Sequence, residues 1–157
     1  MVKSKIVRFL QIVFLIFAVS FLINLFWEIA HSALYDWSAF PLQNDIFFYV
    51  PKILRASAGD GLIMIGIYGL GILKNRKINW ISKIKISDYL LIIFLGLIIS
   101  VLIEKLNVQL LGRWSYTDFM PIIPWLNVGL TPILQMLVLP LFIFKIISFF
   151  KLIDKFT

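Results

Sequence analysis

The sequence predicts an all-α fold, a bundle of four transmembrane helices with both ends of the chain on the cytoplasmic side. Three observations predict it: an apolar composition, four apolar segments of membrane-spanning length, and an uneven distribution of charge. Of the 157 residues, 61% are hydrophobic and the mean hydropathy is +0.98. Soluble domains are about 45–50% apolar, so we expect a single transmembrane domain over 1–157.

Four apolar segments approach the ~20 residues that a helix needs to cross a bilayer. They lie at about 7–30, 57–74, 88–111 and 128–149. The first follows three basic residues and so resembles a signal peptide, but no small-residue cleavage site comes after it. We therefore interpret it as a retained membrane span.

Charged residues divide the remaining regions into two sets. Regions 1–8, 74–88 and 145–157 hold 11 Lys and Arg residues and two acidic residues. Regions 28–60 and 104–127 hold four basic and six acidic residues. Because basic residues concentrate on the cytoplasmic side of membrane proteins, the first set is predicted to be cytoplasmic.

This assignment defines the loops. The basic loop at about 75–87 is cytoplasmic, and the outer loops at about 31–56 and 112–127 lie on the opposite side. An even number of spans agrees with two cytoplasmic termini.

Composition also excludes several classes of site and partner. The chain has no cysteine and one histidine, so disulfides, thiolate metal sites and His-rich metal sites are excluded. We expect no cofactor. The net charge of +7 is attributed to basic residues beside the spans rather than to nucleic-acid binding. The expected partners are membrane lipids and an apolar lipid-like small molecule, and a homo-oligomer or a membrane protein partner stays open.

Polar residues within the apolar segments recur at intervals of three or four, which places them on one helix face. They are Ser20, Asn24, Glu28, His31 and Tyr35 in the first segment, Asp60 in the second, Ser100, Glu104 and Asn107 in the third, and Thr131 and Gln135 in the fourth. A carboxylate in lipid costs about 2.5–3.5 kcal/mol or more, so these faces should point into the bundle. The ~1.5 Å rise per residue puts them in its outer half, which predicts a polar pocket there.

The residue types in this pocket suit acid/base chemistry. The candidate catalytic residues are Glu104, Asp60, Glu28 and His31. A carboxyl group shielded from water can donate a proton at neutral pH, and an imidazole can relay one. Aromatic faces stabilise a developing carbocation. The candidate ligand-binding residues are Asn24, Asn107, Arg113, Trp114, Tyr116 and Gln135.

Structural alternatives exist for these residues. Asp60 could cap a helix that begins at SAGD, and Glu104 could form an ion pair with Lys105 or Arg113. A further alternative is a lipid-headgroup anchor made of Arg113, Trp114 and Tyr116.

Glu28 and His31 could also be interfacial residues that face water. Their i, i+3 spacing is that of di-iron helical bundles, but there is no second such pair, so no metal site is predicted. A single divalent ion bound by the four candidate catalytic residues is an alternative by ligand type.

Three stretches, NLFWEIAHSALY (24–35), SAGDGLI (57–63) and residues 104–135, resemble a family of small bacterial integral membrane proteins. The shared pattern is N-x-x-W-E, A-G-D, E-x-L-N, W-x-Y, M-P and G-L-x-P-x-x-Q, over about a third of the chain. The resemblance implies a bacterial cytoplasmic (inner) membrane location and no particular activity. Its motif positions are Asn24, Glu28, Asp60, Glu104, Asn107, Trp114, Tyr116 and Gln135. The chain is more faintly similar to sterol-isomerase-type, emopamil-binding membrane bundles, which also use intramembrane His and Glu with a Trp, and we treat this as an analogy of residue types.

Three functions fit these features. The first is an enzyme or binding protein for an isoprenoid or other lipid-like ligand, acting by acid/base chemistry. The second is a non-enzymatic accessory or assembly subunit whose polar residues pair structurally. The third is a proton-coupled transporter, which would require an oligomer because four spans without an inverted repeat are too few.

Overall fold

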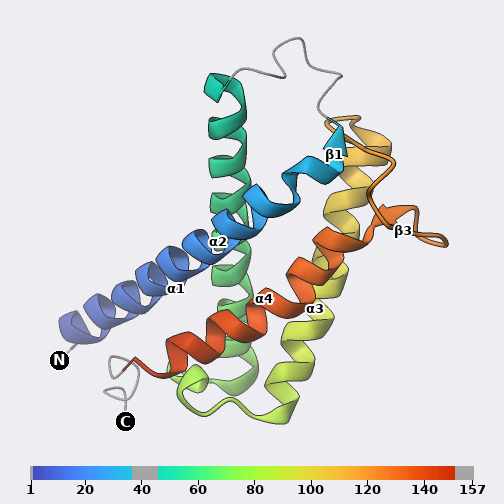
Figure 1. The fold of residues 1–157 in the computed structure, drawn as a ribbon. Coiled ribbons are helices and arrows are strands. Elements are labelled where there is room, and N and C mark those ends of the chain that lie inside the picture. Colours follow the sequence, from blue (N-terminus) through green and yellow to red (C-terminus); the bar gives the residue numbers. More distant parts are fainter. Residues whose placement is uncertain (1, 37–45, 151–157) are drawn as a thin grey trace.

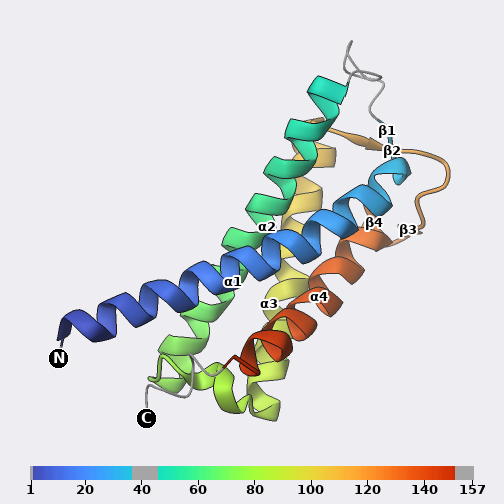
Figure 2. The same ribbon diagram turned by 60° about the vertical axis from the view of Figure 1, so that its left-hand side comes forward.

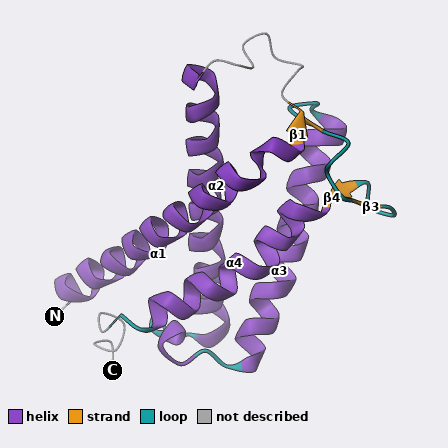
Figure 3. Cartoon of the chain, viewed as in Figure 1, coloured by secondary structure: helices purple, strands orange, loops and turns teal. Residues whose placement is uncertain are grey.

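The chain folds into long helices joined by turns and short strands (Figures 1 and 3). The computed structural model describes residues 2–36 and 46–150. Within them four long helices occur: α1 (Val2–His31), α2 (Ile46–Asn75), α3 (Ile86–Glu104) and α4 (Leu130–Ser148). Each contains a segment long and apolar enough to cross a membrane. The predicted all-α bundle of four helices is confirmed.

The structure changes two of the predicted boundaries. Helix α2 begins at Ile46 rather than near residue 57, so the outer loop predicted over 31–56 is shorter, and its part 37–45 lies outside the described residues. Helix α3 ends at Glu104 and continues as a π-helix, Lys105–Leu110. Such wider turns are frequent at functional sites.

The helices alternate in direction, so the bundle has two distinct ends (Figures 1 and 2). The start of α1, the connection between α2 and α3, and the end of α4 lie at one end, which we call the basic end. The short strands lie at the other, the polar end. Helix α1 packs against α2 and α4, and α3 packs mainly against α4.

The apolar core occupies the half of the bundle nearer the basic end. Its fully buried side chains include Ile16 of α1, Tyr68 of α2 and Phe144 of α4. Trp80, in a 3₁₀ turn (Trp80–Lys83) between α2 and α3, inserts here, with ring centroids 6.2 Å from Tyr68 and 5.6 Å from Phe144. Gly71 makes room for it, since a Cβ there would lie 2.2 Å from the Trp80 ring.

An ion pair joins α2 to α3 at the basic end. Lys74 Nζ lies 2.5 Å from Asp88 Oδ1, and Asn75 Nδ2 donates to the same oxygen at 2.8 Å. The Lys85 backbone N–H donates to Asp88 Oδ2 at 2.9 Å, which also caps α3. This buried carboxylate is therefore fully used by local contacts.

Large apolar side chains cover the outside of the helices. Examples are Phe14 and Phe26 of α1, Leu73 of α2, Leu90 of α3 and Phe142 of α4. A continuous apolar surface of this kind is unfavourable in water, whereas hydrocarbon solvates it. With the four candidate spans, it indicates an integral membrane protein.

Four two-residue strands pair at the polar end. Strand β1 (Tyr35–Asp36), which follows a 3₁₀ turn (Ser32–Leu34), pairs antiparallel with β2 (Ser115–Tyr116). Strand β3 (Ile122–Ile123) pairs with β4 (Val128–Gly129), which leads directly into α4. The first pairing sets Tyr35 opposite Tyr116, and so fixes two phenol groups that are 81 positions apart in the chain.

Candidate functional site

A cavity of about 510 Å³ opens between the helices toward the polar end. Its lining includes the four candidate catalytic residues, Glu28, His31, Asp60 and Glu104, and also Gln135. Most of the wall is apolar and includes Ile53, Ile63, Ile103 and Met136. Ligand pockets of about 300–1,000 Å³ with few polar groups are typical of small-molecule sites.

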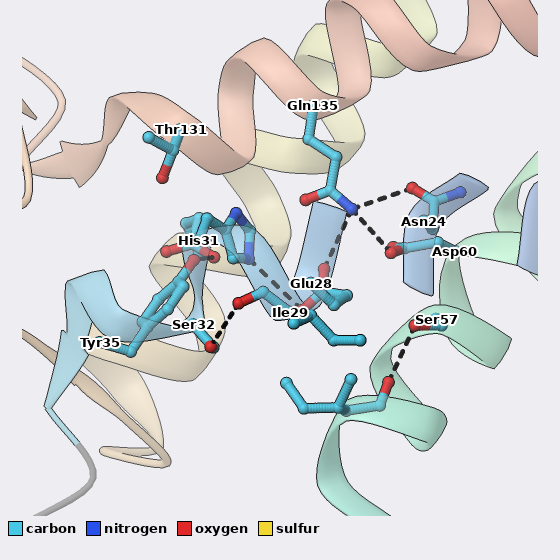
Figure 4. A network of polar contacts seen from close by, with 12 residues as sticks. Asn24, Glu28, Ile29, His31, Ser32, Tyr35, Ser57, Asp60, Thr131 and Gln135 are labelled. Carbon is cyan, nitrogen blue, oxygen red and sulfur yellow. Dashed lines mark hydrogen bonds and ion pairs between the residues drawn. The ribbon is translucent and has the colours of Figure 1, made fainter. Parts of the chain in front are cut away.

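Gln135 of α4 is the hub of one polar cluster in this cavity (Figure 4). Its Nε2 atom lies 2.9 Å from Asn24 Oδ1, 3.0 Å from Glu28 Oε1 and 2.9 Å from Asp60 Oδ2. Two helices, α1 and α2, thus supply acceptors to one amide nitrogen of a third helix, α4. We call these four residues the Gln135 cluster.

The Gln135 cluster has fewer hydrogen-bond donors than acceptors. Asn24 Nδ2 donates to the Ser20 carbonyl at 2.9 Å, which turns Asn24 Oδ1 toward Gln135 as an acceptor. The Gln135 amide has two hydrogens but faces three oxygen atoms. Glu28 and Asp60 bring two of them, so one further proton between the carboxyl groups would complete the hydrogen bonds and relieve like-charge repulsion.

His31 faces the second oxygen of Glu28. Its Nε2 lies 3.4 Å from Glu28 Oε2, and the imidazole is 6% exposed. The rings of Trp27 and Tyr35 contact it edge-on, with centroids 6.1 Å and 5.3 Å away. Among the described residues, none forms a hydrogen bond with His31 Nδ1, so this buried nitrogen has unused bonding capacity.

Glu104 forms a second polar cluster, which we call the Glu104 cluster, with two phenol groups. Tyr35 Oη donates to Glu104 Oε1 at 3.3 Å, and Tyr116 Oη donates to Glu104 Oε2. The Gly129 N–H donates to Tyr116 Oη at 2.9 Å, which leaves the phenol hydrogen for the carboxylate. Glu104 thus accepts hydrogen bonds from both tyrosines.

Burial keeps these phenol groups protonated. It raises the pKa of Tyr35 far above its ordinary value, and the Glu104 charge raises that pKa further. Burial also raises the pKa of Tyr116, and the hydrogen bond to Glu104 adds to the effect. Because both phenols stay neutral, both remain hydrogen-bond donors to the Glu104 carboxyl group.

The π-helix turns the end of α3 toward the β2 loop. Leu111 N donates to the Leu106 carbonyl at 2.9 Å, and Arg113 N donates to the Asn107 carbonyl at 2.8 Å. The Arg113 guanidinium also donates to Asn107 Oδ1 at 3.2 Å. This places Arg113 and Trp114 at the cavity, where both are lining residues.

The structure brings together the site residues that the sequence suggested. Eight of the ten line the cavity, and the other two, Asn24 and Tyr116, bond to lining residues. The helix-cap alternative for Asp60 is wrong, because Asp60 lies well inside α2. Within the described parts of the chain, Glu104 forms no ion pair, so that alternative is also wrong.

Sequence reasoning missed other lining residues. Tyr35 and Ser100 belonged to the polar stripes but were given no role, and Lys52 and Arg55 were not considered. The signal for Lys52 and Arg55 is their i, i+3 spacing, in helical register with Gly59. It was hidden because residues 46–56 were assigned to a loop.

No group of three or more His, Asp or Glu side chains in residues 2–36 and 46–150 is arranged to hold a metal ion. The polar groups of the cavity are instead bonded to amides and phenols. The chemistry that the arrangement can support is therefore proton transfer and hydrogen bonding by side chains.

Comparisons with protein-family models, with curated proteins and with solved structures find no match to this chain.

Proposed function

We propose that the cavity binds an isoprenoid or other lipid-like ligand and that the protein isomerises or cyclises it by acid/base chemistry. One observation carries this proposal: carboxyl groups from three helices converge on one largely apolar cavity in two clusters with different hydrogen-bond partners. Pairs of titratable groups in contrasting surroundings are typical of acid/base sites.

The two clusters suit opposite roles. In the Gln135 cluster, the carboxyl groups of Glu28 and Asp60 have fewer donors than acceptors, which favours a proton held between them. Glu104 instead accepts hydrogen bonds from two neutral phenols, and such donors stabilise a carboxylate when it carries its charge. The Gln135 cluster is accordingly the proton donor, and Glu104 is the proton acceptor.

The proposed reaction moves one proton in and one proton out. A proton from the Glu28–Asp60 pair adds to a carbon–carbon double bond of the ligand, which leaves a carbocation on the neighbouring carbon. The Glu104 carboxylate and the ring faces of Trp114 and Tyr35 stabilise this cation. Glu104 then removes a proton from an adjacent carbon, and the double bond re-forms at a new position, directly or after ring closure.

The composition of the ligand is unchanged by these steps. The proton taken up by Glu104 must return to the Glu28–Asp60 pair before the next turnover. His31 contacts Glu28 and has an unused buried nitrogen, so it suits this relay.

The test uses solvent deuterium. Cells that express the wild-type protein or Glu104→Gln are grown in D2O medium, and their lipids are compared by untargeted mass spectrometry. A lipid with additional carbon-bound deuterium only in the wild-type cells is expected. Equal patterns, with the variant stably folded, would contradict catalysis.

Binding is tested separately by filling the cavity. Gly59 lines the cavity and a Cβ there meets nothing within 4 Å, as is also true of Gly66, which does not line it. Gly59→Leu should abolish the retention of copurified lipid, and Gly66→Leu should preserve it. If neither the wild-type protein nor Gly66→Leu retains lipid, the competing proposal of a structural accessory subunit is favoured.

We also propose that the basic end faces the cytoplasm and that the membrane is a bacterial inner membrane. The support is the concentration of Lys and Arg in the connection between α2 and α3, which lies beside the start of α1 and the end of α4 (Figure 2). The basic residues Lys151 and Lys155 lie outside the described residues.

A further inference from the structure

The mouth of the cavity is basic, although the polar end as a whole is not. Four Lys and Arg residues occur in regions 28–60 and 104–127. Three of them, Lys52, Arg55 and Arg113, line the cavity, and the fourth, Lys105, does not. Basic residues at this end are thus gathered around one opening.

Burial separates the mouth from the interior. Arg55 and Arg113 are exposed, whereas Glu104 and Gln135 are each 3% exposed. The guanidinium groups therefore lie at the solvent-facing rim and the carboxyl groups lie deeper. Between them the wall includes Ile53 and Ala56.

The two exposed arginines of the rim are not neutralised by the deeper carboxyl groups. Glu104 is bonded to the two tyrosines, and Glu28 and Asp60 are bonded to Gln135. Among the described residues, Arg55 and Arg113 form no ion pair. The Arg113 guanidinium donates a hydrogen bond to Asn107 Oδ1 at 3.2 Å. This contact orients the group in advance, so that less side-chain entropy is lost when it binds a ligand.

Helix α2 provides the rim and the wall on one face. Lys52, Arg55, Gly59 and Ile63 recur every three or four residues and all line the cavity. Because Gly59 has no side chain and open space in front of it, a ligand can pass from the charged rim to the apolar interior along this face.

We infer that the ligand is an amphiphile with a phosphate or diphosphate headgroup, which Arg55 and Arg113 bind at the rim while its apolar chain enters the cavity. This inference rests on the proposed lipid-binding function and names its ligand class. Guanidinium and ammonium groups bind phosphate through charge-assisted hydrogen bonds. The apolar wall favours a lipid headgroup over a free phosphate ion.

The experiment compares probes with one chain length and different headgroups. Purified protein in dodecyl maltoside micelles is titrated with dodecyl phosphate, dodecanol, dodecyltrimethylammonium and inorganic phosphate. The readout is tryptophan fluorescence, because Trp114 lines the cavity. Dodecyl phosphate is expected to bind at least about tenfold more tightly than dodecanol, since a hydrogen bond to a charged group contributes about 1.5–3 kcal/mol.

Variants assign the effect to the rim. Arg55→Gln and Arg113→Gln should each weaken dodecyl phosphate binding by roughly tenfold and leave dodecanol binding unchanged. Lys105→Gln, which removes the one basic residue at this end outside the cavity, is the matched control and should change neither. Higher salt should weaken the phosphate probe alone.

The outcomes separate this inference from the proposed function. Equal binding of dodecyl phosphate and dodecanol, both lost in Gly59→Leu, would overturn the headgroup inference and keep the cavity as a lipid site. Preference for dodecyltrimethylammonium would overturn it in the same way. Tight, arginine-dependent binding of inorganic phosphate alone would show that the arginines bind free phosphate and not the headgroup of a lipid. Failure of every alkyl probe would remove both the inference and the proposed function.

Discussion

The side-chain amide of Gln135 on α4 lies 2.9 Å from the Asp60 carboxyl on α2, and the two residues are 75 positions apart in the chain. The same nitrogen contacts Asn24 and Glu28 of α1. One amide therefore connects three helices at the polar end.

Replacing this amide should destabilise the bundle. Gln135→Leu removes the donor and leaves two carboxyl groups and one amide oxygen buried without it, at a cost of about 1–3 kcal/mol. Thermal unfolding in maltoside micelles measures the loss. Gln11→Leu, at an exposed position on α1, is the matched control and should change stability by less than about 0.5 kcal/mol. Equal effects of the two variants would show that the hydrogen bonds of Gln135 do not stabilise the folded protein.

The two tyrosines of the Glu104 cluster should differ in importance. Tyr116→Phe removes the hydrogen bond to Glu104 and also the acceptor of the Gly129 N–H, so we expect a loss of about 1–3 kcal/mol. Tyr35→Phe removes a 3.3 Å hydrogen bond to the same carboxyl group and should cost less. The order is read from the unfolding temperatures of the single variants. The reverse order would contradict the described orientation of the Tyr116 hydroxyl.

Alkaline pH should weaken the fold through these same phenols. An ordinary tyrosine has a pKa of about 10, and burial raises the pKa of Tyr35 and Tyr116 above it. Their stabilising contribution is complete below pH about 10 and is lost as the pH rises toward the folded-state pKa values, because only the unfolded chain ionises.

The measurement is the unfolding temperature against pH, from about 8 to 11.5, a range that brackets the ordinary tyrosine pKa. The double variant Tyr35→Phe/Tyr116→Phe should show a shallower decline than the wild type. Lysines also titrate in this range, but they are common to both proteins and cancel in the difference. Parallel curves would mean that these phenols ionise as easily in the folded protein as in the unfolded one.

Two glycines of α2 offer a paired test of packing. A Cβ at Gly71 would lie 2.2 Å from the Trp80 ring, whereas a Cβ at Gly66 meets nothing within 4 Å. Gly71→Ala should therefore destabilise by about 1–3 kcal/mol, and Gly66→Ala should be neutral or slightly stabilising, since alanine favours helix. Unfolding temperatures of the two variants decide it. A neutral Gly71→Ala would require Trp80 to sit elsewhere.

The absence of cysteine makes the proposed orientation easy to test. Lys77→Cys places a thiol in the connection between α2 and α3, and Asp118→Cys places one in the turn after β2. In intact cells a membrane-impermeant maleimide should label Asp118→Cys and leave Lys77→Cys unlabelled until the membrane is disrupted. The opposite labelling pattern would invert the orientation.

Much of the candidate site could be predicted from spacing. Glu28 and His31 on one segment, Glu104 on another and Gln135 on a third each recur with polar neighbours at helical intervals, and a carboxyl group within an apolar segment is costly unless it faces the interior. That reasoning located the residues. It could not identify their partners, because helical spacing fixes a face and not the side chain opposite.

The sequence by itself determined the four apolar segments, their alternation and the face on which each polar residue lies, since composition and period depend only on local order. The tertiary structure alone decided which groups meet. Gln135 reaches Asp60 because α1 packs against both α2 and α4, and Tyr116 lies opposite Tyr35 because β2 pairs with β1. It also extended α2 back to Ile46, which turned Lys52 and Arg55 from loop residues into the rim of the cavity. These contacts join residues far apart in the chain, and only the packing of the helices against one another specifies them.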